Sequence, residues 1–234
     1  MTDSAATPHV RFNLLRGEWV LVSPHRTARP WQGQIEQPQP DDTPASEPSC
    51  YLCPGAARAG GAVNPRYDST FVFDNDFPAL VPDTPRDEER IGELLIARGE
   101  PGRCRVVCFS PRHDLTLSRL DQTSLRRVVD AWIREYTTLG ADPAINYVEI
   151  FENRGAAMGA SNPHPHGQIW ATASIPNEPA REQAELLSYR ARNGRCLLCD
   201  SFGSSANAAS AWSAKTTASW RWCRSGPSGR SKSW

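Results

Sequence analysis

The sequence contains little lysine and no long apolar run. Of its 234 residues 26 are Lys or Arg, but the lysines are only Lys215 and Lys232, close to the end. The formal net charge is zero, so the overall charge favours neither a nucleic-acid nor a membrane partner. No apolar run approaches the ~20 residues of a membrane span, and the first residues lack the basic and apolar regions of a signal peptide. We therefore expect a cytoplasmic protein.

Disulfide frameworks usually have an even number of cysteines, and this chain has seven cysteines beside five histidines. That composition favours a reducing compartment and metal ligation. Cys50-x-x-Cys53 supplies two of the four ligands that structural zinc requires. Cys196-x-x-Cys199 is a second such pair, so a four-cysteine site is chemically possible.

The residues with the most chemical character lie between 151 and 171. An apolar run is followed by a loop of small residues and then by a second extended run. Alternation in the second run places His164, His166, Gln168 and Trp170 on one strand face. Two imidazoles and a carboxamide beside a glycine-containing loop predict a phosphate site with a nucleophile. The alternative is an edge strand, marked by Pro165, whose histidines have no function.

The run Gly155–Trp170 resembles the active-site signature of the galactose-1-phosphate uridylyltransferases, a family of the histidine-triad superfamily. Residues 23–31, Cys50-x-x-Cys53 and residues 75–77 are similar to further blocks of that family, in the same order. The resemblance covers about residues 9–200. It implies an α+β fold: a histidine-triad-like antiparallel, partly open sheet with helices packed on one face.

The resemblance also implies an activity. Family members exchange UMP between UDP-glucose and galactose-1-phosphate, giving glucose-1-phosphate and UDP-galactose, and act as homodimers. His166 would be the nucleophile of a ping-pong reaction and Gln168 a hydrogen-bond donor to the phosphate. An unperturbed imidazole, with a pKa of about 6.5, is largely neutral near pH 7 and needs no base to attack.

The resemblance extends to the residues that would contact the substrate. They are Arg26, Arg29, Ala59, Asn75, Asp76, Asn153, Gly159, Ala160, Ser161 and Gln168. Without the resemblance, Arg26 and Arg29 would be read as solvated surface side chains, although arginine suits phosphate. Asn75 and Asp76 would likewise be read as an ordinary turn at the end of a strand.

The resemblance also implies two metal sites. The implied zinc ligands are Cys50, Cys53, His113 and His164, a set that we favour over four cysteines. Glu182 aligns with an iron ligand of the family. The partner histidines of that iron would lie beyond residue 200, where this chain has no histidine. We therefore expect no bound iron and an unpartnered Glu182.

Hydrophobic periodicity predicts the main elements. Strands are expected within residues 10–22 on both sides of a turn, at 70–73 and at 103–110, and helices at 121–139 and 179–192. Asp121 is the predicted cap of the first helix and Gly140 its end. Cys104 and Cys108 lie in an apolar run and are expected to be buried small hydrophobes.

The last part of the chain differs in character, so we expect one domain over 1–200 and a tail over 201–234. The tail has no Asp or Glu, and Ser and Trp crowd within it. Codons for Val-Ala-Val-Val-Pro-Phe-Trp-Ala-Val-Trp-Pro-Phe, a family-like run, read one base later as Trp-Arg-Trp-Cys-Arg-Ser-Gly-Pro-Ser-Gly-Arg-Ser, which is residues 220–231. This agreement predicts a frameshift near residues 200–219. A basic tail for an acidic partner and simple disorder are the alternatives.

Two other functions compete with the uridylyltransferase. Dinucleoside polyphosphate phosphorylases share a His-x-His-x-Gln core, but the Cys50-x-x-Cys53 pair and the Arg26/Arg29 loop argue against them. The chain could also be a truncated, catalytically weak or inactive zinc-binding half-protein, because family members continue into a second half.

Overall fold

The computed structural model of this chain describes residues 7–30, 43–155 and 158–207. Contacts divide the chain into two compact units. One unit comprises Met1–Gln32 with Asn177–Trp234, and the other comprises Gly33–Pro176. Each unit is described by itself below.

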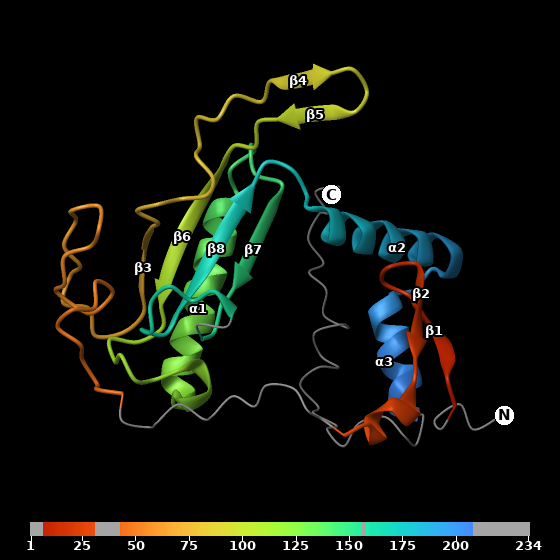
Figure 1. Cartoon of the computed structure of the whole chain (residues 1–234), viewed down its shortest axis with the longest axis horizontal. Coiled ribbons are helices and arrows are strands. Elements are labelled where there is room, and N and C mark those ends of the chain that lie inside the picture. The colour runs from red at the N-terminus through yellow and green to blue at the C-terminus, as the bar shows by residue number, and fades with distance from the viewer. Residues whose placement is uncertain (1–6, 31–42, 156–157, 208–234) are drawn as a thin grey trace. The chain divides into compact units, whose positions relative to one another are not determined.

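The larger unit is built on a four-stranded antiparallel sheet. Its strands are β3 (Phe71–Asp74), β6 (Gly102–Cys108), β7 (Tyr147–Phe151) and β8 (His166–Thr172). Their order is β3-β6-β8-β7, and every neighbouring pair is antiparallel (Figure 1). The sheet is open, as the sequence predicted, and the predicted strands at 70–73 and 103–110 are confirmed as β3 and β6.

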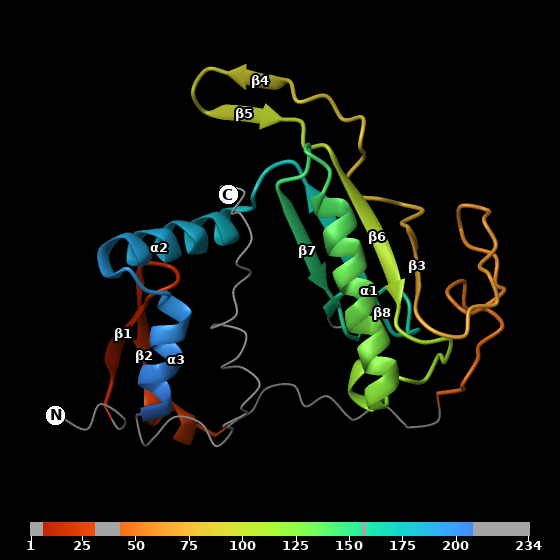
Figure 2. The same ribbon diagram turned by 180° about the vertical axis from the view of Figure 1, so that it is seen from behind.

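Helix α1 (Gln122–Gly140) covers one face of this sheet (Figure 2). The Asp121 side chain accepts the Ser124 N–H at 2.7 Å, which satisfies a backbone donor at the start of the helix. Val128 is fully buried in a cluster with Ile169 and Ala171 of β8. The predicted helix, its cap and its end at Gly140 are confirmed.

The alternation along β8 assigns the two faces of the sheet. Gly167, Ile169 and Ala171 are buried, and Ile169 and Ala171 belong to the α1 cluster. His166 and Gln168 are half-buried on the other face. Because successive side chains of a strand point to opposite sides, one face of β8 builds the core and the other is left for chemistry.

The strand register shows what surrounds that second face. Cys108 lies opposite His166, and Val106 lies opposite Gln168. Directly opposed residues project from the same face, and Cys108 and Val106 pack in a cluster with the segment that contains Cys50 and Cys53. The cysteine segment therefore packs on the face that carries His166.

One sequence prediction needs correction here. β8 begins at His166, so His164 precedes the strand, although its ring still meets the Cys53 segment that packs on the His166 face. The His164 N–H donates to the Asn162 side chain at 2.8 Å, and Pro165 has no N–H to offer a neighbouring strand. Asn162 thus bends the backbone before the strand, and Pro165 accepts the Phe109 N–H at 3.3 Å but has no donor to return.

Two short elements of this unit carry no clear sequence signal. They are the hairpin of β4 (Glu88–Ile91) and β5 (Leu95–Arg98) and the 3₁₀ turn η2 (Leu117–Arg119). All side chains of β4 and β5 are exposed, so no buried face imposes an apolar alternation on them.

The smaller unit packs a hairpin against helices. Its elements are β1 (His9–Asn13), β2 (Glu18–Val22), the 3₁₀ turn η1 (Pro24–Ala28), α2 (Asn177–Asn193) and α3 (Leu197–Asn207). β1 and β2 are antiparallel and are joined by a turn at Gly17, whose φ is 65°. Both strands and the helix predicted over 179–192 are confirmed.

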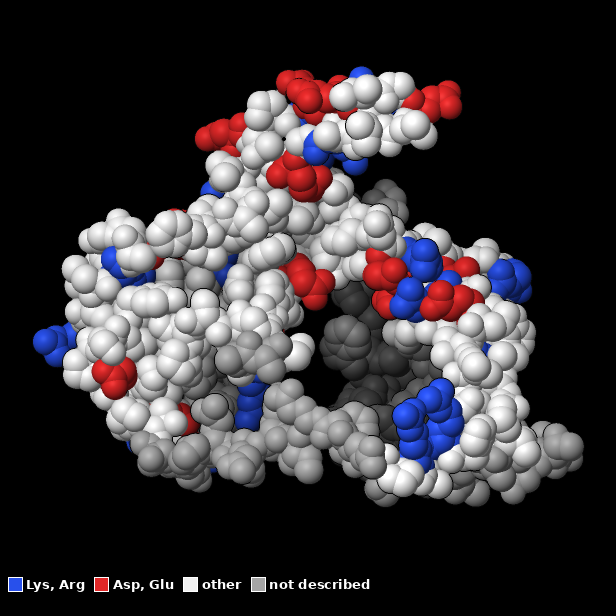
Figure 3. Space-filling view, viewed as in Figure 1, with Lys and Arg blue, Asp and Glu red and all other residues white. Residues whose placement is uncertain are grey.

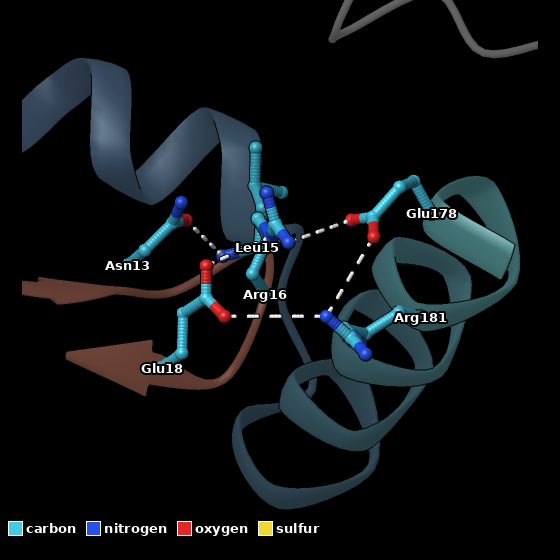
Figure 4. A network of polar contacts seen from close by, with 6 residues as sticks. All are labelled: Asn13, Leu15, Arg16, Glu18, Glu178 and Arg181. Carbon is cyan, nitrogen blue, oxygen red and sulfur yellow. Dashed lines mark hydrogen bonds and ion pairs between the residues drawn. The ribbon is translucent and has the colours of Figure 1, made fainter. Parts of the chain in front are cut away.

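An ion network joins that hairpin to α2 (Figure 4). Arg16 contacts Glu18 at 2.9 Å and Glu178 at 3.1 Å. Arg181 lies 3.7 Å from Glu178 and 4.0 Å from Glu18. Figure 3 shows the two signs of charge side by side over α2. Exposed pairs contribute little individually, so this network adds little to the stability of the unit.

The expected domain boundary after residue 200 falls inside α3, which continues to Asn207. Residues 208–234 lie outside the described part, so the frameshifted tail stays a prediction. Within the described ranges, no helix is long and apolar enough to cross a membrane.

Candidate functional site

Four predicted metal ligands come together in the larger unit. Cys50, Cys53, His113 and His164 are all buried, and their ligand atoms all lie within 4.8 Å of one another. Cys53 Sγ is 3.7 Å from His113 Nδ1 and 3.5 Å from His164 Nδ1. Zinc–sulfur and zinc–nitrogen bonds in a tetrahedron place S and N about 3.5 Å apart. The donor set and its spacing therefore fit a metal ion.

Burial favours a metal at this site for a further reason. Desolvation lowers the pKa of His164 to about 4, so its imidazole is neutral at pH 7, as ligation requires. Desolvation also raises the pKa of the Cys53 thiol. A cation between the two cysteines is what would make thiolates favourable in this interior.

Groups around the four ligands hold His164 in place. His164 Nε2 lies 3.0 Å from the Ser110 carbonyl, which leaves Nδ1 facing Cys53. Asn162 is buried, accepts the His164 N–H, and lies 3.5 Å from Cys50 Sγ. Such outer contacts fix the ring and its tautomer. Sequence reasoning missed Asn162, although an Asn two residues before a ligand is a signal for a local turn.

Tyr67 and Asn64 anchor the cysteine segment from outside. The Tyr67 hydroxyl donates to the Leu52 carbonyl at 2.6 Å, and its burial raises the pKa of that phenol. The Asn64 amide donates to the carbonyls of Tyr51 and Cys53 at 2.9 and 3.1 Å. These contacts are long-range in sequence, so no local pattern could have identified them. Cys108 is fully buried, as predicted, and burial raises the pKa of its thiol to about 12.

His166 has one ring nitrogen fixed by the backbone. Its Nδ1 lies 2.7 Å from the His164 carbonyl oxygen. A carbonyl can only accept, so Nδ1 carries the proton and the lone pair resides on Nε2. His164 therefore contributes its side chain to the cluster of four potential metal ligands and its carbonyl to the orientation of His166.

Gln168 follows His166 on the same strand face. Its Oε1 accepts the Trp170 indole N–H at 3.1 Å. That contact fixes which end of the carboxamide is which and leaves the NH₂ group as the donor. An amide donates hydrogen bonds without exchanging a proton.

The loop before β8 differs in part from expectation. Gly155 and Gly159 have φ of 81° and 84°, in the left-handed region that glycine tolerates. The Ala160 N–H donates to the Gly155 carbonyl at 3.2 Å, so this donor is used within the loop. Ser161 is exposed, and Ala156 and Ala157 lie outside the described residues. Asn153 is half-buried two residues after β7.

The two predicted nucleotide segments meet at Asp76. The Asp76 carboxylate lies 3.6 Å from Arg58 Nη2, and both side chains are largely buried. A Cβ on Gly60 would lie 2.9 Å from Asp76 Oδ1, so the carboxylate rests against the turn that carries Ala59. The Asn75 side chain accepts the Phe77 N–H at 3.0 Å, which closes a local turn. Arg58 was missed, since one arginine in a turn gives no sequence signal.

Three predicted residues lie in the other unit. Arg26, in η1, and Arg29, just after it, are exposed. Glu182 lies on α2 and is exposed. Among the described residues, Glu182 belongs to no group of three or more His, Cys, Asp or Glu side chains that could hold a metal ion. The structure does not place these three residues relative to His166, so their roles stay predictions.

Comparison with known proteins adds a family to this geometry. Residues 1–176 match the model of the galactose-1-phosphate uridyl transferase N-terminal domain. Galactose-1-phosphate uridylyltransferases from Haemophilus influenzae and Rattus norvegicus each share 47% sequence identity with this chain, in alignments that cover 82% of it. The match covers 55% and 50% of those proteins, so the chain spans about half the length of the curated relatives it matches.

Among solved structures, an ADP-glucose phosphorylase from Arabidopsis thaliana with bound ADP-glucose has a TM-score of 0.61. It is 24% identical, and the alignment covers 84% of this chain and 59% of that one. At that identity the likeness establishes the fold alone. It agrees with the predicted histidine-triad-like α+β architecture.

Proposed function

The chain belongs to the galactose-1-phosphate uridylyltransferase family, and from this we propose that it carries the nucleophilic half of an enzyme that exchanges UMP between UDP-glucose and galactose-1-phosphate. The products would be glucose-1-phosphate and UDP-galactose. The observation that carries the proposal is the state of His166, whose Nδ1–H is held by a backbone carbonyl while Nε2 keeps its lone pair.

The reaction that this geometry supports has two steps. Nε2 of His166 attacks the α-phosphorus of UDP-glucose, the bond from that phosphorus to the bridging oxygen breaks, and glucose-1-phosphate leaves. A phosphate oxygen of galactose-1-phosphate then attacks the same phosphorus and displaces Nε2, giving UDP-galactose. The charge that develops on the imidazole is stabilised through Nδ1–H and the His164 carbonyl. The order of steps predicts ping-pong kinetics.

Gln168 supports the phosphorus in both steps. Its NH₂ group is available to donate to a phosphoryl oxygen because its carbonyl is occupied by Trp170. A well-aimed donor of this kind contributes about 1–4 kcal/mol in the transition state. Asn153, Ser161 and the Gly159 N–H are proposed as further phosphate contacts. The Ala160 N–H can contribute only if it leaves the Gly155 carbonyl.

The nucleoside would lie over Ala59, Asn75 and Asp76. Asn75 follows β3, an edge strand that pairs with β6, and β6 pairs in turn with β8. The Asn75 N–H donates to the Cys104 carbonyl, and Cys104 lies opposite Trp170, so Asn75 is level with Trp170 of β8. A nucleoside at the end of β3 would therefore extend across β6 and along β8 for its phosphate to reach His166.

We propose zinc as the ion of the Cys50, Cys53, His113 and His164 cluster, because two thiolates and two imidazoles suit it. Its contribution would be structural: four closed ligands fix the segment that ends in the His164 carbonyl. Glu182 alone gives iron no site, so no iron is proposed. A homodimer, with Arg26 and Arg29 reaching the partner's substrate, and a cytoplasmic location complete the proposal.

The decisive experiment replaces the nucleophile. His166→Gly should abolish uridylyl exchange, because no other group occupies the position of Nε2. Added imidazole should then restore part of the transfer from an activated uridylyl donor. Ser188→Ala, which removes an exposed side-chain contact with Arg192 on α2, serves as the control. Full activity in His166→Gly would eliminate the mechanism.

The same assay separates the competing functions. Replacing galactose-1-phosphate by inorganic phosphate tests for phosphorolysis, and a dinucleoside polyphosphate as donor tests the phosphorylase. A zinc-loaded chain that forms no uridylyl-histidine with UDP-glucose would identify a zinc-binding half-protein. The covalent intermediate is measured directly by mass, so it is visible even if turnover requires the second half of the family protein.

A further inference from the structure

Two thiols at the start of α3 take no part in the site described above. Cys196 immediately precedes the helix, and its carbonyl accepts the Asp200 N–H at 3.1 Å, the first bond of the helical turn. Cys199 lies three residues later, in that first turn. Residues three apart on a helix share one side, so the two side chains are neighbours. Cys196 is exposed and Cys199 is partly exposed.

This pair differs in chemistry from the Cys50 and Cys53 pair. Those cysteines are buried and are completed by two histidines. No third Cys, His, Asp or Glu joins Cys196 and Cys199 in a ligand cluster within the described ranges. Two ligands open to solvent do not make a structural zinc site, whereas two accessible thiols are what thiol–disulfide exchange needs.

The surroundings of Cys196 favour its thiolate. A hydrogen bond from the Cys199 backbone N–H lowers the pKa of the Cys196 thiol, and the Cys199 side chain and the Leu198 N–H act in the same direction. Desolvation and, to a smaller degree, the Asp200 carboxylate oppose this effect. Arg195, at 2.6 Å, and the Tyr189 hydroxyl, at 2.9 Å, take up that carboxylate. A thiol at a helix N-terminus in a Cys-x-x-Cys segment is the typical attacking thiol.

We propose that Cys196 and Cys199 form a reversible dithiol–disulfide pair that exchanges with small-molecule disulfides of the glutathione type, with Cys196 attacking and Cys199 resolving. The proposal does not depend on the uridylyl transfer. It assigns a redox-sensitive site to the smaller unit, apart from the residues of the nucleotide site.

The chemistry balances with glutathione disulfide as the oxidant. The Cys196 thiolate attacks one sulfur of glutathione disulfide, the S–S bond breaks, and one glutathione thiolate leaves. Cys199, losing its proton to solvent, then attacks Cys196 Sγ. The protein S–S bond forms, and the second glutathione leaves as a thiolate. Two protein thiols are oxidised and one glutathione disulfide is reduced to two thiols.

The test uses the full 234-residue chain loaded with zinc and equilibrated in glutathione buffers of graded redox ratio. After an acid quench, trypsin cleaves after Arg195 and Lys215, so one peptide contains both thiols and separates them from Cys223. The expected result is a loss of two hydrogens from that peptide as the buffer becomes oxidising, reversed on reduction. Cys223→Ser should behave like the unaltered chain.

Single variants distinguish the two roles. Cys199→Ser should accumulate a glutathione adduct on Cys196, and Cys196→Ser should lose the fast reaction. In the unaltered chain, where folding is not in question, iodoacetamide should modify Cys196 before Cys199. The proposal is overturned if the peptide stays reduced in oxidised glutathione or pairs with Cys223. It is also overturned if Cys196→Ser/Cys199→Ser lowers the bound zinc by one equivalent.

Discussion

At the scale of single residues, His164 links structure and chemistry with different atoms. Its ring joins the buried cluster of four potential metal ligands, and its carbonyl holds Nδ1 of His166. A change in the backbone at His164 should therefore alter both the metal affinity of the cluster and the orientation of the His166 ring. Asn162, which accepts the His164 N–H, holds that backbone.

We predict that Asn162→Ala weakens zinc binding. Loss of the buried acceptor frees the His164 backbone and removes the polar neighbour of Cys50. Loss of an outer contact of this kind typically lowers metal affinity by about 10–100-fold. The measurement is competition with a chromophoric chelator. Asn193→Ala, which removes an exposed contact at the end of α2, is the control and should leave the affinity unchanged.

Arg58 is a second residue whose role comes from its contacts. Its guanidinium lies 4.1 Å from the centre of the Phe73 ring and 3.6 Å from Asp76. Its Nε and Nη1 are buried and have no hydrogen-bond partner among the described residues. The Arg58 charge therefore lies between the Phe73 ring and the Asp76 carboxylate, and it holds that carboxylate in position.

We predict that Arg58→Met raises the KM for UDP-glucose about tenfold and changes kcat little, because Asp76 loses the charge-assisted contact that orients it. Steady-state kinetics and nucleotide binding on this chain measure the effect. Arg90→Met removes an exposed ion pair with Glu88 and serves as control. An equal effect from both variants would mean that general charge, and not the position of Asp76, matters.

At the scale of elements, β8 serves two functions because a strand has two faces. One face packs under α1 and the other presents His166 and Gln168. The close approach of β6 to β8 is part of this arrangement. A Cβ on Gly102, the first residue of β6, would lie 2.3 Å from the Ala171 carbonyl oxygen.

We predict that Gly102→Ala lowers the free energy of unfolding by about 1–3 kcal/mol, since a backbone oxygen must move to admit the methyl group. Gly140→Ala is the matched control, because a Cβ there meets nothing within 4 Å. That second change should be neutral or slightly stabilising at the end of α1. Urea unfolding followed by circular dichroism measures both, and equal stabilities would contradict the packing argument.

At the scale of the whole molecule, the cluster of four potential metal ligands belongs to the unit of Gly33–Pro176, while the hairpin β1–β2, α2 and α3 belong to the other unit. The cluster joins three segments that are far apart in sequence, at residues 50–53, 113 and 164. A metal there would stabilise one unit and would contribute nothing directly to the other.

We predict that chelation increases hydrogen exchange in one unit only. Removing the metal leaves four buried polar ligands without their shared partner, so amides near Leu52, Asn64 and His164 should exchange faster. Amides of β1 and β2 should keep their rates. Hydrogen-exchange mass spectrometry with and without chelator makes the comparison. If chelation removed the zinc and left the exchange rates of these amides unchanged, a structural role for the metal would be contradicted.

The sequence by itself determined the two faces of β8 and the helix α1, because these follow from periods of two and 3.6 residues. Side-chain chemistry alone left a four-cysteine site open, and the set with His113 and His164 came from the family resemblance. The sequence also indicated the family, since the loop and histidine run are long and specific. It placed His164 on the strand, because alternation contains no information about the residue at which the strand begins.

Only the tertiary structure decided which distant residues meet. Asp76 lies beside Arg58, and the Leu52 carbonyl accepts the Tyr67 hydroxyl, only because the folded backbone brings these segments together. None of these partners has a periodic signature. Local patterns fix which side of an element is apolar, whereas a hydrogen bond or ion pair depends on the position of a second segment, which only the packed chain provides.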